Sequence, residues 1–188
     1  LFKAPVLTRS GYGEQSRFAL RALRSREDMF DIYIQPLQWG NTSWINEESE
    51  ERQWIDQAIE KTIHYIQSNG QFDISLQVTI PNEWEKIAAV NIGYTAGIET
   101  TKVAPVWLEK GNMMDRIVVV SNHSKNTYEK TVYNAVNKQT NEEFVYKLTT
   151  PIEAVNYPVK TYEELPSLKL DLPCDFNFIC VFSEYKLS

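Results

Sequence analysis

Three polar segments of the 188-residue chain contain residue types that can bind a ligand. The first is a glycine turn, Ser10-Gly11-Tyr12-Gly13, which joins a predicted strand to a predicted helix. Backbone N–H groups at a helix start point outward and carry partial positive charge, and glycines let an anion approach them closely. The turn therefore indicates a phosphate site, although such a glycine pair also occurs where only the turn geometry requires it.

The second and third polar segments each follow a predicted buried strand. One contains Thr95, Glu99 and Thr100, and the other contains Asn122 and His123. Their hydroxyl, carboxylate, amide and imidazole groups can hydrogen-bond to a ligand, and the Glu99 carboxylate could bind sugar hydroxyls. The alternative for Glu99 is that it caps the helix that follows. The alternative for His123 is a structural hydrogen bond, the commoner role of a lone histidine.

The elements around these segments have the order of a parallel α/β sheet. Apolar runs predict strands at 3–8, 31–37, 72–80, 87–92, 117–120 and 152–157, and helical spacing predicts helices at 14–24, 51–68, 105–110 and 124–133. The helix at 51–68 is expected to bury Trp54, Ile55, Ala58, Ile59, Thr62, Ile63 and Ile66. Alternating apolar residues predict a β-hairpin within 131–148.

Strands that alternate with helices predict a Rossmann-like fold, in which a mostly parallel sheet carries helices on both faces in three α/β/α layers. Ligands bind to such sheets beyond the carboxyl ends of the strands. Since each of the three polar segments follows a strand, we expect all of them at this edge.

Composition argues against several classes of function. The net charge is −6 and the pI is about 5.1, and the sequence has no basic stripe for nucleic acid. No apolar run approaches the ~18 residues of a membrane span, and no signal-peptide pattern is present. Cys174 and Cys180 have neither metal-site spacing nor enough partners for a disulfide framework, so no metal is predicted. A cytoplasmic protein with reduced cysteines is expected.

The central part of the chain resembles the N-terminal half of the family 4 glycosyltransferases. That family often reads T-x-x-E-T, then a helix with proline and tryptophan, then N-x-x-D and a strand ending V-P-S. The matching residues here are Tyr94–Thr100, Val103–Trp107, Asn112, Asp115 and Ile117–Ser121. One departure is Val120, which stands where the family often has proline. The first glycine turn and the helix after it are similar to the family's first glycine loop.

The resemblance implies the N-terminal half of a GT-B fold, in which two Rossmann-like domains face each other across a cleft. It implies an acceptor-side domain at 1–160, a linker at 161–174 and the start of a truncated donor-binding domain at 175–188. The implied enzyme moves a sugar, with retention, from a nucleotide sugar to an acceptor hydroxyl. The fragment alone would be inactive, and it would hold no cofactor of its own.

The resemblance also implies a role for each candidate residue. Residues Ser10, Gly11, Tyr12 and Gly13 would bind the donor diphosphate. Glu99 would face the reacting sugar as the candidate catalytic group, although it is not assigned as a nucleophile. The cleft beside it would be lined by Thr95, Thr100, Asn122 and His123. The implied partners are a nucleotide sugar and an acceptor glycan, lipid or protein, together with a peripheral contact to a membrane and no nucleic acid.

Two alternatives belong to other classes. A nicotinamide-dependent enzyme would use the same glycine turn, but the third glycine position holds Ser16 and no acid follows the second strand. A non-catalytic α/β domain could instead bind carbohydrate or a partner protein. Trp39 and Trp44, in the connection after the second strand, are either a platform for a sugar or, more often, a lid over the edge of the core.

Overall fold

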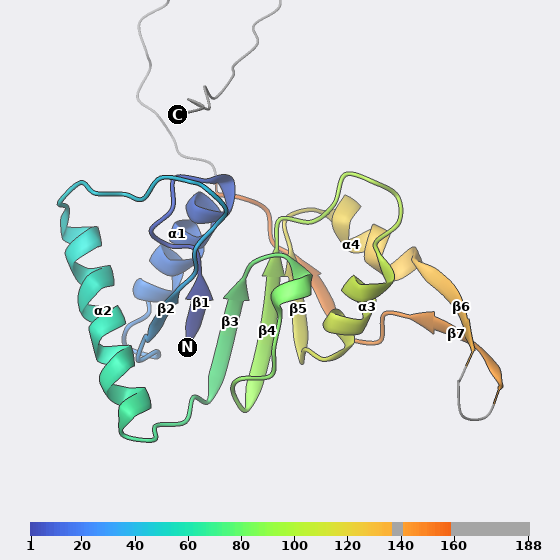
Figure 1. Ribbon diagram of the computed structural model, residues 1–188. Coiled ribbons are helices and arrows are strands. Elements are labelled where there is room, and N and C mark those ends of the chain that lie inside the picture. The colour runs from blue at the N-terminus through green and yellow to red at the C-terminus, as the bar shows by residue number, and fades with distance from the viewer. Residues whose placement is uncertain (137–140, 159–188) are drawn as a thin grey trace, which may run out of the picture. The chain divides into compact units, whose positions relative to one another are not determined.

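A six-stranded parallel sheet lies at the centre of the computed structural model, which describes residues 1–136 and 141–158 (Figure 1). Its strand order is β2-β1-β3-β4-β5-β8, and every pairing is parallel. The strands are β1 (Phe2–Ala4), β2 (Ile34–Pro36), β3 (Ile74–Val78), β4 (Val90–Thr95), β5 (Arg116–Val119) and β8 (Ile152–Ala154). The predicted Rossmann-like sheet is therefore confirmed. Pro36, which cannot donate a ladder hydrogen bond, lies in the edge strand β2.

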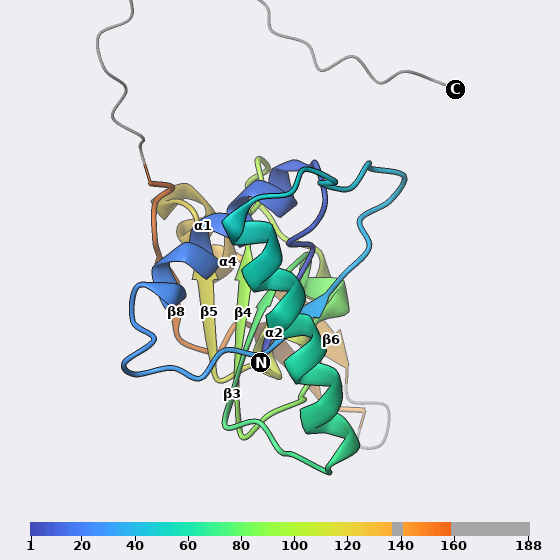
Figure 2. The same ribbon diagram turned by 90° about the vertical axis from the view of Figure 1, so that its left-hand side faces the viewer.

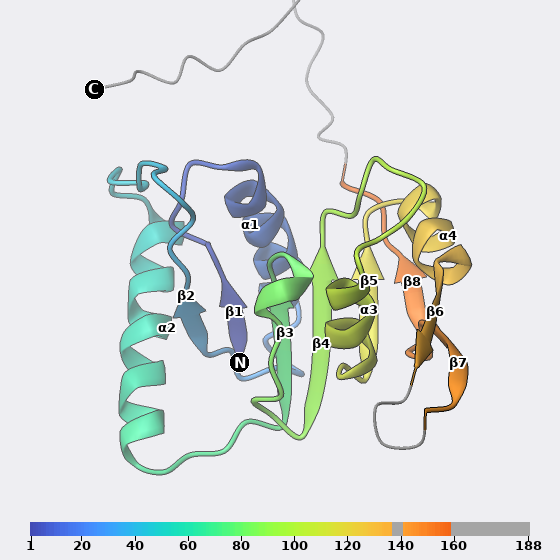
Figure 3. The same cartoon turned by 45° about the vertical axis from the view of Figure 1, so that its right-hand side comes forward.

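Helices cover both faces of this sheet. They are α1 (Gly11–Arg24), α2 (Glu50–Gln67), α3 (Pro105–Asn112) and α4 (Asn122–Lys130), together with a 3₁₀ turn, η1 (Pro81–Glu83). Side chains of α1 and α2 share one hydrophobic cluster with β1 and β2, and those of α3 and α4 share a second cluster with β5 and β8. Along β5, Val118 packs on the first cluster whereas Ile117 and Val119 belong to the second, as alternation in a strand requires. Figure 3 shows α1 and α3 on opposite sides of the sheet.

The edge strand β2 is covered by α2, which lies nearest to the viewer in Figure 2. The Oγ1 of Thr62 accepts the backbone N–H of Ile34 at 2.7 Å and so fixes the helix to the strand. Ile63 and Ile66 were predicted to be buried, but each is 51% exposed. The reason is that β2 has only three residues, so the sheet edge is too short to cover the whole apolar stripe of an 18-residue helix.

The predicted hairpin is also confirmed. It consists of β6 (Val132–Val136) and β7 (Glu143–Lys147), which pair with each other in an antiparallel, two-stranded sheet separate from the central one. The predicted linker at 161–174 and the predicted start of a second domain at 175–188 lie outside the described residues.

Two predicted boundaries in the central segment were wrong. Strand β4 begins at Val90 rather than at residue 87, because Asn91 Oδ1 accepts the N–H groups of Ile87 and Ala88 and holds that segment in a turn. Helix α3 continues through Gly111, where a break was predicted. A Cβ at Gly111 would lie 2.9 Å from Ile117 Cδ1, so this glycine allows close packing of the helix on β5.

Candidate functional site

The glycine turn is the first turn of α1, and Ser10 caps it. Ser10 Oγ accepts the N–H of Gly13 at 2.9 Å and lies 2.8 Å from Thr8 Oγ1. Within the described residues, the N–H groups of Gly11 and Tyr12 have no hydrogen-bond partner. Of the predicted phosphate donors, these two are therefore free for a ligand, and Gly13 is not.

The two glycines of the turn differ in the space around them. A Cβ at Gly13 would lie 2.1 Å from the carbonyl oxygen of Thr8, so the close approach of α1 to the loop after β1 requires glycine there. At Gly11 nothing lies within 4 Å of the added Cβ. Packing thus accounts for Gly13, and only Gly11 borders open space.

A buried arginine that was not predicted as a site residue fixes the glycine turn. Arg17 Nη1 donates to the carbonyl oxygens of Val6 and Thr8, both at 2.9 Å, and its Nη2 donates to Glu14 Oε2 at 2.8 Å. The side chain is 8% exposed. Its one signal in the sequence was an arginine next to the apolar side of a predicted helix.

Tyr12 joins the glycine turn to the segment after β4. Its hydroxyl lies 2.9 Å from Thr95 Oγ1 and accepts the N–H of Ala96 at 3.3 Å. Burial of the ring raises the pKa of Tyr12, so the hydroxyl keeps its proton at neutral pH. Two of the three predicted segments therefore lie together at the carboxyl edge of the sheet.

The connection after β2 lies beside the same turn. The carbonyl oxygen of Ser43 accepts the N–H of Arg9, and the carbonyl oxygen of Leu7 accepts the N–H of Ile45, both at 2.8 Å. The ring centroids of Trp39 and Tyr12 are 4.4 Å apart, and Trp39 is only partly buried. Trp39 thus covers Tyr12 and still presents part of its ring to solvent.

The third predicted segment forms the start of α4 rather than a loop. Asn122 and His123 lie in the first helical turn, and both are exposed. His123 Nε2 lies 3.2 Å from the carbonyl oxygen of Thr100, which also accepts Thr127 Oγ1–H at 3.3 Å. These contacts attach the loop after β4 to α4 and give His123 a structural hydrogen bond.

Glu99 lies in the middle of that loop. Its side chain is exposed, and no ion pair or hydrogen bond holds its carboxylate within the described residues. Gly97 has a φ of +92°, and a Cβ there would lie 2.0 Å from Ser124 Oγ. The loop path is therefore fixed close to α4, while the carboxylate stays free. No described contact joins Glu99 to the glycine turn.

The strand order identifies one more group at this edge. The direction of winding reverses between β1 and β3, and such switch points form the binding crevice of open α/β sheets. Thr79, buried just after β3, donates its hydroxyl to Glu83, whose negative charge contributes to the raised pKa of Tyr12. Thr79 and Glu83 were not predicted, because strand order cannot be deduced from the order along the chain.

Comparison with known proteins returned no match to any protein-family model, curated protein or solved structure. The candidate site is therefore defined by its own geometry.

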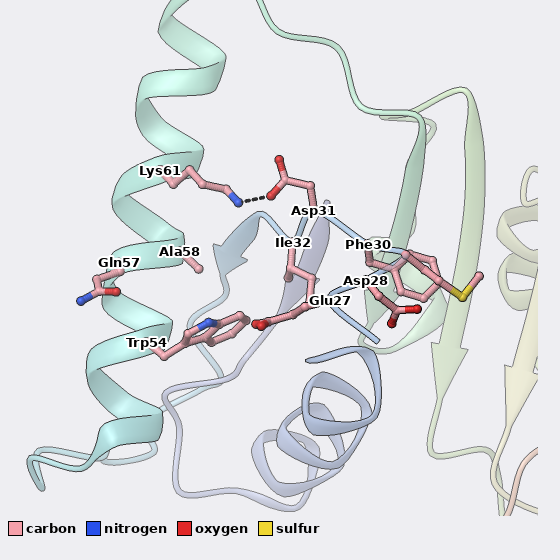
Figure 4. A pocket seen from close by; sticks show the side chains of 10 residues that line it. Glu27, Asp28, Phe30, Asp31, Ile32, Trp54, Gln57, Ala58 and Lys61 are labelled. Carbon is pink, nitrogen blue, oxygen red and sulfur yellow. Dashed lines mark hydrogen bonds and ion pairs between the residues drawn. The ribbon is translucent and has the colours of Figure 1, made fainter. Parts of the chain in front are cut away.

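A hollow of about 620 Å³ lies at the other end of the sheet, between α2 and the segment that enters β2 (Figure 4). Its walls include Trp54, Ala58 and Ile32, and Glu27 and Asp31 lie at its rim. The Asp31 carboxylate accepts Lys61 Nζ–H and, at 2.9 Å, the hydroxyl of Tyr33. None of the predicted site residues lines this hollow.

Among residues 1–136 and 141–158, no cluster of three or more His, Cys, Asp or Glu residues could hold a metal ion. The same residues contain no helix with the length and apolar character needed to cross a membrane.

Proposed function

We propose that the chain is the acceptor-side half of a retaining, family 4-type glycosyltransferase with a GT-B fold. The observation that carries the proposal is the contact of the Tyr12 hydroxyl with Thr95 and Ala96. This contact brings the free N–H groups at the start of α1 beside the segment after β4, and the same segment continues to Glu99. A cytoplasmic location belongs to the same proposal.

The start of α1 would stabilise the leaving diphosphate. As the bond between sugar and phosphate breaks, negative charge grows on the phosphate oxygens. The N–H groups of Gly11 and Tyr12, at the positive end of a 14-residue helix, would face that charge without rearrangement. Arg17 would act indirectly, because it holds the loop that positions these donors.

Glu99 would bind hydroxyl groups of the reacting or acceptor sugar. An exposed carboxylate without an internal partner can accept two hydrogen bonds from neighbouring hydroxyls. Because the described part of the chain supplies only one wall of the implied cleft, we assign Glu99 a role in binding and orientation, and not in covalent catalysis.

The test is turnover of nucleotide sugars by the natural polypeptide that contains this chain. Gly11→Asp is the decisive variant: a carboxylate there favours the helix start but repels a diphosphate. We expect kcat to fall by about 100-fold, the effect of losing a donor to a developing oxyanion. Gln57→Glu adds the same charge on an exposed face of α2 and should leave turnover unchanged. Equal turnover in the two variants would remove the phosphate assignment.

A second pair of variants tests the loop. Glu99→Gln should raise KM for the acceptor by about 10-fold, since a hydrogen bond from a hydroxyl to a charged acceptor contributes about 1.5 kcal/mol or more. The matched control is Glu109→Gln, at an exposed position of α3. If Glu99→Gln and Glu109→Gln have the same KM, Glu99 has no role in the site.

The partly exposed ring of Trp39 favours one alternative, a non-catalytic carbohydrate-binding domain. Aromatic faces beside polar groups bind sugar rings in such domains. Calorimetric binding of a glycan by the natural polypeptide, with no turnover of any nucleotide sugar, would favour this alternative.

A further inference from the structure

The β6–β7 hairpin has an unpaired outer edge. It lies at the end of the molecule opposite to α2 (Figure 1), and within the described residues β7 pairs with β6 alone. An unpaired strand edge presents free N–H and C=O groups, and a two-stranded sheet is marginally stable unless something supports it. This hairpin is supported on one face only.

The supported face carries two tyrosines. Tyr133 and Tyr146 are directly opposite each other and pack against the second hydrophobic cluster, and the Tyr133 hydroxyl donates to the carbonyl oxygen of Val103 at 2.6 Å. The opposite face carries three exposed valines: Val132 is 48%, Val136 55% and Val145 59% exposed. The hairpin is thus attached to the body by its tyrosines and turns its valines to solvent.

The two charged residues of β7 lie on the valine face and lack opposite charges within the hairpin. Glu143 is directly opposite Val136, and Lys147 is directly opposite Val132. Neither side chain takes part in an ion pair in the described part of the chain. Their charges are therefore available to a partner strand.

The sequence of β7 is complementary to itself when reversed. We propose that β7 pairs antiparallel with β7 of a second copy of this chain, about a two-fold axis at Val145. In this register Glu143 lies opposite Lys147 of the second copy, Phe144 lies opposite its Tyr146, and the two Val145 side chains face each other. The result is a four-stranded sheet, β6-β7-β7-β6, with two ion pairs on its valine face.

The same register also allows backbone hydrogen bonds between the two copies of β7. It pairs odd-numbered residues with odd-numbered ones and even-numbered with even-numbered ones. Groups of one copy that point away from β6 therefore meet the equivalent groups of the other copy. The same operation on β6 would place Val132 opposite Val136 and Asn134 opposite itself, with no charged pair. Charge complementarity thus selects the β7 edge.

Sedimentation equilibrium of the chain and its charge variants tests the proposal. Lys147→Glu and Glu143→Lys each place like charges opposite each other twice in the dimer, and each should weaken association by about tenfold or more. The double variant Glu143→Lys/Lys147→Glu restores both pairs and should regain the parent's dissociation constant. A parent that is monomeric at all concentrations, or a double variant as weak as the singles, would overturn the proposal.

A disulfide test locates the contact even if a charge variant folds poorly. In a background of Cys174→Ser and Cys180→Ser, Val145→Cys should form a covalent dimer on mild oxidation, because the two Cβ atoms meet at the axis. Val132→Cys, an exposed valine of β6 on the same face, should not. Equal cross-linking at the two positions would show that another surface joins the copies.

Discussion

Replacement of Arg17 by methionine should destabilise the protein far more than replacement of its neighbour Arg21. Both residues lie on α1, and methionine keeps most of the aliphatic stem in each case. The Arg17 guanidinium serves the buried backbone of the loop after β1, whereas Arg21 binds Glu51 at the surface through Nε and Nη2, at 2.6 and 2.8 Å.

The expected loss of stability in Arg17→Met follows from the two carbonyl groups that Arg17 binds. Val6 and Thr8 are fully buried, so without Arg17 their carbonyl oxygens lose the donor and gain no water. An unsatisfied buried acceptor costs about 1–3 kcal/mol, which gives about 2–6 kcal/mol for Arg17→Met. A surface pair such as that of Arg21 contributes about 0–1 kcal/mol.

Urea unfolding gives both values from the shift in midpoint at constant slope. Arg17→Lys provides a third point. Lysine keeps the positive charge but lacks the forked guanidinium that donates to two carbonyl groups and a carboxylate at once. The free energy of unfolding of this variant should therefore lie between those of the parent and Arg17→Met. If Arg17→Met is no less stable than Arg21→Met, the carbonyl groups find other donors and the positioning role assigned to this arginine is wrong.

Three further predictions concern the same edge of the sheet and α2. Gly13→Ala should lower the free energy of unfolding by about 1–3 kcal/mol, because the added Cβ meets the Thr8 carbonyl. Gly11→Ala should raise the free energy of unfolding by up to about 1 kcal/mol, because nothing lies near its Cβ. Thermal melting measures both changes, and equal shifts in melting temperature would contradict the packing argument. Tyr12→Phe should cost about 1 kcal/mol and speed hydrogen exchange of the amide that its hydroxyl binds, and unchanged exchange would show that the contact is not needed. The hydrogen bonds from Arg21 lower the pKa of Glu51 below its ordinary 4.5. The stabilisation of the folded state by this pair is therefore present above pH 4.5 and is lost as the pH falls through the lowered pKa. Glu51→Gln should flatten the acid side of the plot of stability against pH, and an unchanged acid side would refute the assignment.

Most of the sheet could be predicted because buried strands and amphipathic helices leave periodic signals. The boundaries failed where a side chain replaced the expected backbone pattern, as Asn91 does when it holds the start of β4 in a turn. Ile63 and Ile66 were misassigned because periodicity shows that a face is apolar, but not how much sheet is available to cover it.

The candidate site was predictable to a smaller extent. Sequence placed the polar segments after strands, and the shared edge then followed from the fold. It did not show that Ser10 occupies the N–H of Gly13, or that Thr8 leaves no room for a Cβ there. Nor did it show Arg17 or Thr79, since their partners are distant backbone groups or depend on the strand order.

The position of Trp39 gives the proposed ligand site at the start of α1 an optical reporter. Five indoles are present in the chain; the structure places Trp39 on the ring of Tyr12, and the exposed Trp44 is paired with Thr8 by an isolated bridge in the adjoining loop. Trp84, in contrast, is completely enclosed under the other face of the sheet. A ligand bound at the start of α1 would therefore alter the emission and quenching of Trp39 and Trp44 and leave that of Trp84 unaffected. Binding could then be followed without any label.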